Sequence, residues 1–150
     1  MKKTKRIIFL VANLVLPLVV GSIIYYIVSP NTLFVVRVDQ ILFDGRHLIT
    51  FDLSNSVFRF CRNYLLDMLW SYALVYALYL AHNNNTVRLL RVFLIAFGFS
   101  TVMEFLQLTS LAKGTFDIID IIVEFLAELI AVFIIKKTHE EERKRYEKVF

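Results

Sequence analysis

An uncharged, apolar run from Ile7 to Val28 is the feature that most constrains this chain. At about 1.5 Å per residue, a helix of this length spans the roughly 30 Å hydrocarbon core of a bilayer. The small residues around Val19–Gly21 would suit a signal-peptide cleavage site, but the apolar run continues past them, which favours a retained helix. Pro17 lies mid-run and predicts a bend within a continuing helix, since neighbouring helices can satisfy the carbonyl that a proline frees.

The rest of the chain has the same character. Of its 150 residues, 58% are hydrophobic, and they fall in long blocks. We therefore expect a single integral membrane domain, residues 1–150, folded as an all-α transmembrane bundle. The net charge of +4 does not indicate a nucleic-acid partner, because the basic residues flank the apolar blocks as they do in membrane proteins. Cys61 is the only cysteine, which excludes an internal disulfide and a thiolate metal cluster.

The apolar blocks predict four spans. We expect them at residues 7–28, 64–81, 87–108 and 116–135, followed by a charged tail at 138–150 with a helical extension. In the third block, the small residues Gly98 and Ser100 predict a close approach between helices. In the second block, Tyr72, Tyr76 and Tyr79 share a helical face, which predicts a packing or lipid-facing stripe.

The segment 31–62, between the first two spans, is the least hydrophobic part of the body, and two folds suit it. In a hairpin, Leu33–Val36 and Leu48–Phe51 would be strands on either side of the turn-forming Asp44-Gly45-Arg46. Otherwise the segment forms interfacial amphipathic helices, one of them capped by Ser54-Asn55-Ser56. Runs this short do not decide between the two. The segment is either a lid over a membrane site or a connector on the lipid headgroups.

Lysine and arginine predict the orientation in the membrane. With four spans, both termini and the turn at 82–87 share one side and gather twelve of the seventeen basic residues. The long loop 31–62 and the turn around Lys113 gather five. The positive-inside rule then places both termini in the cytoplasm, and the long loop and the Lys113 turn outside.

Six strongly polar side chains interrupt the last two apolar blocks, between Met103 and Ile135. They are Glu104, Gln107, Asp117, Asp120, Glu124 and Glu128. A carboxylate at the centre of a membrane helix costs roughly 2.5–3.5 kcal/mol even on the lenient insertion scale. At about 100° per residue, the four carboxylates of the last block fall within an arc of about 80°, so we expect their face to point away from lipid.

These residues predict a site in the outer leaflet. Asp67, at the start of the second span, is expected at the same membrane depth as the outer members of this site. Glu124 and Glu128 extend the site toward the membrane centre. The candidate catalytic residues, as general acids or bases, are Asp67, Glu104, Asp117 and Asp120. The predicted binding set is Arg59, Arg62, Asp67, Glu104, Gln107, Asp117, Asp120 and Glu124, with the arginines and Lys113 as counter-charges. The oxygens suit Mg²⁺ or Ca²⁺, while the lack of a cysteine pair and of a histidine within a span argues against Zn²⁺.

The residues leave three functions open and assign no reaction. The site could bind or process a lipid-linked or cationic molecule of the cell envelope, such as a lipid-linked precursor. It could instead be a hydrogen-bonded latch between helices, without chemistry. Glu124 and Glu128 also suit proton or cation transport, but the inner half of the second and third spans offers only tyrosines to continue such a path, unless an oligomer completes it.

Three segments then occur in order, each at a predicted helix end. They are Asn63-Tyr-Leu-Leu-Asp67-Met-Leu-Trp70, Glu104-Phe-Leu-Gln107 and Gly114-Thr-Phe-Asp117-Ile-Ile-Asp120. Together they resemble the VanZ-like family of small bacterial membrane proteins, over residues 63–135. The resemblance implies a multi-span protein of the bacterial cytoplasmic membrane, and a link to resistance against the glycopeptide antibiotic teicoplanin. Where that family often has Asn or Gly in the last helix, this chain has Glu124, Ala127 and Glu128, which makes the deep part of the site more acidic.

Overall fold

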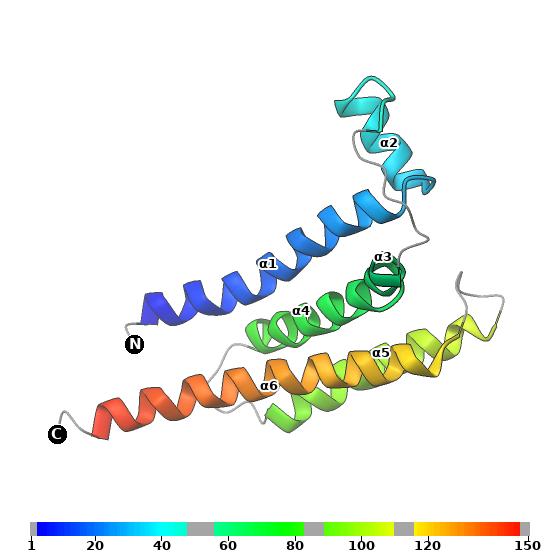
Figure 1. Ribbon diagram of the computed structural model, residues 1–150. Coiled ribbons are helices and arrows are strands. Elements are labelled where there is room, and N and C mark those ends of the chain that lie inside the picture. Colours follow the sequence, from blue (N-terminus) through cyan, green and yellow to red (C-terminus); the bar gives the residue numbers. More distant parts are fainter. Residues whose placement is uncertain (1–2, 48–55, 83–88, 110–115, 148–150) are drawn as a thin grey trace.

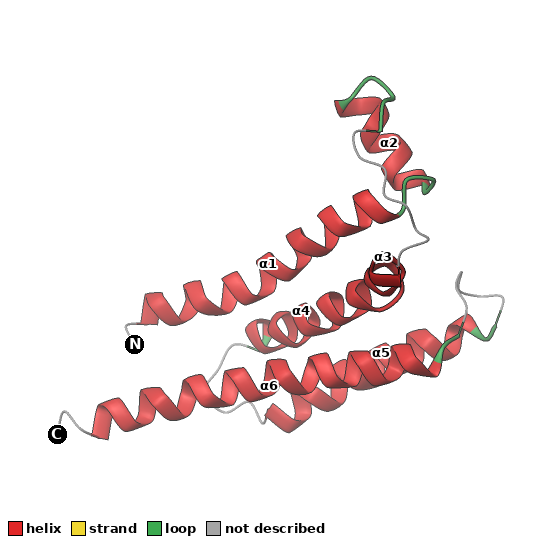
Figure 2. Ribbon diagram, viewed as in Figure 1, coloured by secondary structure: helices red, strands yellow, loops and turns green. Residues whose placement is uncertain are grey.

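The computed structural model describes residues 3–47, 56–82, 89–109 and 116–147, and their side chains except those of residues 3 and 141–147. This described part is built from helices and turns, without a strand (Figures 1 and 2), which agrees with the predicted all-α fold. The helices are α1 (Lys3–Val28), α2 (Leu33–Leu42), α3 (Ser56–Phe60), the π-helical turn η1 (Cys61–Leu65), α4 (Leu66–Ala81), α5 (Leu89–Gln107) and α6 (Ile118–Glu147).

Within the described ranges, three helical stretches are long and apolar enough to cross a membrane. They are Thr4–Val28, Ser56–Ala81 and Leu89–Gln107, and they support the expectation of a membrane protein. The longest helix, α6, is not among them, because its apolar part carries several carboxylates. α6 also continues as helix through the predicted stop at Lys136 and into the charged tail.

The first two long helices extend beyond the predicted bounds. α1 begins at Lys3 and passes through Pro17 without ending, as predicted. The second span was predicted to begin at residue 64, but the helix begins at Ser56, and α3, η1 and α4 follow one another without a break. The apolar residues after Ser56 continue the block, and no glycine or proline interrupts it before the span. The wider turn at Cys61–Leu65 marks a local irregularity in this helix.

Of the two folds left open for the segment 31–62, the structure shows a helix where the hairpin would need its first strand. Leu33–Val36 is part of the helix α2, in which Val35 and Asp39, about one turn apart, are both buried. The predicted turn does form: Asp44 and Gly45 have φ of 50° and 78°. It ends a helix instead of joining two strands. The second predicted strand and the cap residues Ser54 and Asn55 lie outside the described residues.

α4 is the centre of the bundle. It packs against α1 on one side and against α5 and α6 on the other, while α2 stands apart at the end of α1 (Figure 1). The core is formed by Leu10, Val75, Tyr76, Tyr79, Val92, Ala96, Ala131 and Ile135. The tyrosine stripe of α4 is therefore a packing stripe, one of the two predicted alternatives.

The close approach predicted at Gly98 is wrong. Gly98 is exposed, and a Cβ added to it would meet no atom within 4 Å. The fully buried small residues on α5 and α6 are Ala96 and Ala131. Ser100, one turn beyond Ala96, is buried as predicted. The face of α5 that carries small buried residues is therefore the one with Ala96 and Ser100.

Candidate functional site

The carboxylates predicted from sequence gather at one end of the bundle. α5 ends and α6 begins at this end, where the helix that continues into α4 also begins (Figure 1). Asp67 lies on the first turn of α4, Glu104 on the last turns of α5, and Asp120 on the first turn of α6. We call this end the acidic end. The acidic site comprises Asp67, Glu104, Asp117, Asp120, Glu124 and Glu128.

Repulsion between neighbouring carboxylate charges links the six groups into one cluster. Asp120 interacts with Asp67, Glu104 and Asp117. Glu124, one turn deeper, interacts with Asp67, Glu104 and Glu128. The structure thus brings together carboxylates from α4, α5 and α6, which the sequence could place only at a similar depth.

Three of these carboxylates are almost fully buried. The exposed fractions are 5% for Glu104, 9% for Glu124 and 0% for Glu128. Gln107 Nε2 donates a hydrogen bond to Glu104 Oε1 at 2.8 Å, and Ser100 Oγ donates one to Glu128 Oε1 at 2.9 Å. The second bond joins α5 to α6 and is the interhelical contact expected of a latch.

The other oxygen of each buried carboxylate has no partner among the described residues. Oε2 of Glu104, Glu124 and Glu128 is buried without a hydrogen bond, and so is Oδ1 of Asp120. A buried polar atom without a partner costs about 1–3 kcal/mol, and more if it is charged. Four such atoms in one site therefore call for a proton, a cation or a ligand that donates hydrogen bonds.

The predicted counter-charges do not fill this role among the described residues. Arg59 and Arg62 lie at the acidic end but are exposed. Arg59 Nη2 donates to Ser56 Oγ at 3.4 Å, and Arg62 Nε donates to Asn63 Oδ1 at 3.2 Å. Neither forms an ion pair with a described carboxylate, and Lys113 lies outside the described residues.

Asp117 has a structural role at the entrance to the acidic site. Its Oδ1 accepts a hydrogen bond from the backbone N–H of Ile119 at 2.9 Å, which caps the start of α6. Its Oδ2 accepts one from the Tyr64 hydroxyl at 3.4 Å, a long bond that links α6 to η1. Asp117 is thus half-buried and satisfied, unlike the deeper members of the site.

The described residues do not form a metal centre. Within the described ranges, no three His, Cys, Asp or Glu side chains are placed to hold one metal ion together. The carboxylates are spread along the helices instead of converging on a point. The geometry therefore adds no support to the expectation of Mg²⁺ or Ca²⁺.

In the other half of the bundle, two tyrosines of the predicted stripe bind polar side chains that the sequence did not mark as functional: Arg6, Asn13 and His139. The Tyr72 hydroxyl donates to Asn13 Oδ1 at 2.7 Å. Arg6 Nη2 donates to the Tyr79 hydroxyl at 2.7 Å and to His139 Nε2 at 2.8 Å, and His139 also contacts the Tyr79 hydroxyl. These contacts join α1, α4 and α6. Besides the tyrosine stripe, the sequence signal for these contacts is the seven-residue spacing of Arg6 and Asn13, which places both on one face of α1.

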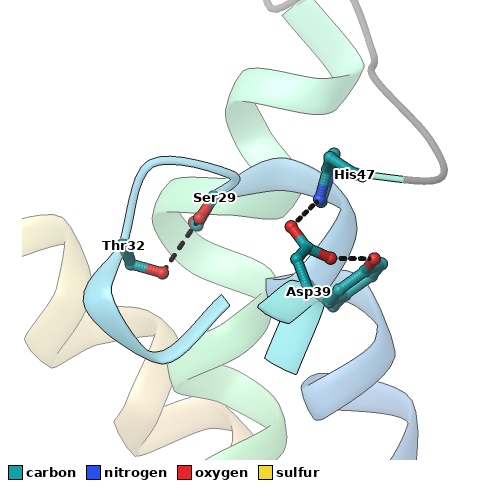
Figure 3. Close-up of polar contacts among 5 residues, drawn as sticks. Ser29, Thr32, Asp39 and His47 are labelled. Carbon is teal, nitrogen blue, oxygen red and sulfur yellow. Dashed lines mark hydrogen bonds and ion pairs between the residues drawn. The ribbon is translucent and has the colours of Figure 1, made fainter. Parts of the chain in front are cut away.

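A second polar cluster lies beyond the end of α1, on α2 and the turn after it. The buried Asp39 accepts hydrogen bonds from the Tyr26 hydroxyl at 2.5 Å and from His47 Nδ1 at 2.8 Å (Figure 3). Burial would raise the pKa of Asp39, but the hydrogen bonds from Tyr26 and His47 and the charge of His47 outweigh it and hold the pKa below its ordinary value. This cluster fixes α2 to α1.

The acidic site suits a limited range of chemistry. Since the described residues supply no basic partner, its buried oxygens can be protonated, can accept hydrogen bonds from a ligand, or can surround an organic cation. The remaining predicted binding residue, Gln107, is engaged with Glu104 and orients that carboxylate. Comparison with models of known protein families, with curated proteins and with solved structures finds no match.

Proposed function

We propose that the acidic site binds a cationic or lipid-linked molecule of the cell envelope. The observation that carries this proposal is the set of buried carboxylate oxygens on Glu104, Glu124 and Glu128 that lack a hydrogen-bond partner among the described residues. An ammonium or hydroxyl group of a ligand would supply the missing donors. The surrounding apolar helices suit a ligand that carries a lipid chain.

The proposal includes an orientation. We take α6 as the fourth span; the burial of Glu124 and Glu128 and the exposure of Ile122, Leu126 and Phe133 support this. With four spans, the excess of basic residues near both termini places the termini in the cytoplasm of a bacterial cell. The acidic end then faces the outer leaflet of the cytoplasmic membrane, where envelope precursors are found once they have crossed it.

The resemblance to the VanZ-like family gives this proposal a phenotype to test. The segments that carry the resemblance include Asp67, Glu104, Gln107, Asp117 and Asp120, which are members or neighbours of the acidic site. We propose that the protein contributes to teicoplanin resistance through this site. Glu124 and Glu128 depart from the family pattern and extend the site inward, which favours a ligand with more than one donor group.

The test compares variants in cells and in detergent. Asp67→Asn, Glu104→Gln and Asp120→Asn, each made singly, should abolish the change in teicoplanin sensitivity that expression of the protein confers. Glu140→Gln is the control, since it removes an exposed carboxylate on α6 that lies outside the site. If the three variants instead lose thermal stability, and sensitivity follows only the amount of folded protein, the carboxylates are a latch and the binding proposal fails.

A second candidate function, proton or cation transport, is favoured by one observation. The half of the bundle opposite the acidic end carries a series of polar groups, from Asn13 and Tyr72 to Tyr79 and His139. These groups continue, in the other half of the bundle, a polar path that begins at Glu128. Transport predicts a proton or cation flux into liposomes that disappears in Glu128→Gln and persists in Glu140→Gln. The absence of flux in the unaltered protein would eliminate this candidate.

A further inference from the structure

An apolar groove lies between α1 and α2 and shares no lining residue with the acidic site. Its volume is about 510 Å³, and its lining runs along α1 from Val15 to Tyr26 and across to Phe34 and Val38 on α2. The Ser22 hydroxyl in its wall is turned to the Leu18 carbonyl at 2.8 Å. The Tyr26 hydroxyl donates to Asp39. The polar groups in the wall are therefore satisfied, so the groove suits an apolar occupant.

Ring contacts hold α2 at an angle to α1 and so create the groove. Phe34 packs on Tyr25 with ring centroids 6.3 Å apart, and Phe43 packs on Tyr26 at the same separation. The His47 ring lies 4.8 Å from the Tyr26 ring. Figure 1 shows α2 leaving the end of α1 at a steep angle, so the two helices meet only at this corner. The side chains that line the groove come from both helices that form this corner.

The depth of the groove identifies its occupant. Most of its α1 wall lies within the apolar stretch Thr4–Val28, which is long enough to cross a membrane. At about 1.5 Å per residue, the wall from Val15 to Tyr26 is roughly 17 Å long. One leaflet contributes about half of the 30 Å hydrocarbon core, or roughly 15 Å. The groove therefore has the length, depth and apolar lining of a site for one acyl chain.

The surface beyond the groove suits a lipid phosphate. Arg37 on α2 and Arg46 in the turn after it are both exposed. Asp39, between them in sequence, is engaged by Tyr26 and His47 and is buried, which leaves Asp44 as the exposed acid of this region. Positive charge thus lies next to the groove where the headgroup of a lipid in the same leaflet would lie.

We propose that the groove between α1 and α2 is a binding site for one acyl chain of a phospholipid. α2 is the clamp of this site, and the Tyr26–Asp39 hydrogen bond holds it in place. The site does not depend on the function proposed for the acidic site, since no residue of the acidic site contributes to its lining.

Photolabelling of the unaltered protein tests the proposal. The probe is phosphatidylglycerol with a diazirine at the end of one acyl chain, present at a low fraction in phosphatidylcholine vesicles that contain the protein. Adducts are mapped by mass spectrometry. We expect Val15–Ile23 and α2 to be labelled several-fold more than the lipid-exposed residues Leu90, Leu94 and Phe99 of α5. Equal labelling of both regions would mean that the groove holds only passing bilayer lipid, and would overturn the proposal.

A pair of matched variants tests the groove itself. Val19→Trp places a large ring in the groove, whereas Leu16→Trp places the same ring on an exposed position of α1 outside the lining. Labelling of α2 should fall in Val19→Trp and stay at the level of the unaltered protein in Leu16→Trp. An equal effect of the two variants would contradict the proposal. If Val19→Trp does not fold, the labelling ratio of the unaltered protein still decides.

Discussion

Replacing Glu128 by methionine tests whether the buried carboxylates serve binding or stability. Glu128 is fully buried, with one oxygen bonded to Ser100 and the other without a partner among the described residues. Methionine has a similar length and no group that requires a hydrogen bond. If the carboxylate is kept for a ligand, the protein should become more stable without it, because functional sites often cost stability.

The expected gain follows from two opposing contributions. Removing the unpaired oxygen relieves about 1–3 kcal/mol. Losing the bond from Ser100 costs about 0.6 kcal/mol, the average for hydrogen bonds between membrane helices. The Ser100 hydroxyl can then turn to a backbone carbonyl of its own helix, so it does not remain unpaired. Glu128→Met should therefore raise the free energy of unfolding by about 1–2 kcal/mol.

The assay is reversible unfolding in mixed micelles, followed by the fluorescence of Trp70, the only tryptophan. Ser100→Ala should lose about 0.6 kcal/mol on its own, and Ser100→Ala/Glu128→Met should keep most of the gain. Glu140→Met, at an exposed position of α6, is the control and should change stability by less than about 0.5 kcal/mol. A loss of about 3 kcal/mol or more in Glu128→Met would refute the reasoning, because breaking a structural latch has that cost.

Three smaller predictions follow from the helices. Gly98→Ala should add about 0.5–1 kcal/mol to the free energy of unfolding, because the new methyl group meets open space; a loss in the same assay would place a helix against Gly98. Tyr79→Phe should cost about 1.5–3 kcal/mol, since it removes the hydrogen bond that the hydroxyl accepts from the charged Arg6, and an unchanged stability would contradict that contact. Because folding lowers the pKa of Asp39, its hydrogen bonds stabilise the fold at pH values above the ordinary pKa of 3.8. This contribution is lost as the pH falls through the lower pKa of the folded state. A cysteine that replaces Val35 in a Cys61→Ser background should therefore stay protected from thiol reagents between pH 7 and pH 5, once the rates are corrected for the fraction of thiolate. Loss of protection within that range would disprove the docking of α2.

The helices and the acidic face could be predicted because each depends on local sequence. Long apolar blocks set the extent of α1 and α5 within a few residues. The helical repeat placed Glu124 and Glu128 on one face, and both are buried. Their partners on other helices could not be predicted: the sequence placed Glu104 only at a similar depth, and the structure adds that Glu124 interacts electrostatically with Glu104.

Features that depend on distant contacts could not be predicted. The runs in 31–62 suited a strand or a helix equally, and in the structure Asp39 of α2 is bound by Tyr26 from another helix. Arg6 and His139 are 133 residues apart, so no local pattern pairs them. Gly98 was assigned to a helix contact by residue type alone, and its true surroundings depend on the rotation of α5 within the bundle.

Carbodiimide labelling tests most directly whether the acidic site receives a cationic group. Dicyclohexylcarbodiimide reacts with carboxyl groups in apolar surroundings, and its adducts on Glu104 and Glu124 can be mapped by mass spectrometry. Dodecylamine carries the ammonium that the site is proposed to bind, while dodecanol has the same chain without the charge. We predict that dodecylamine protects both residues and that dodecanol does not. Equal protection by the two amphiphiles, or none by either, would contradict a site for a cationic ligand.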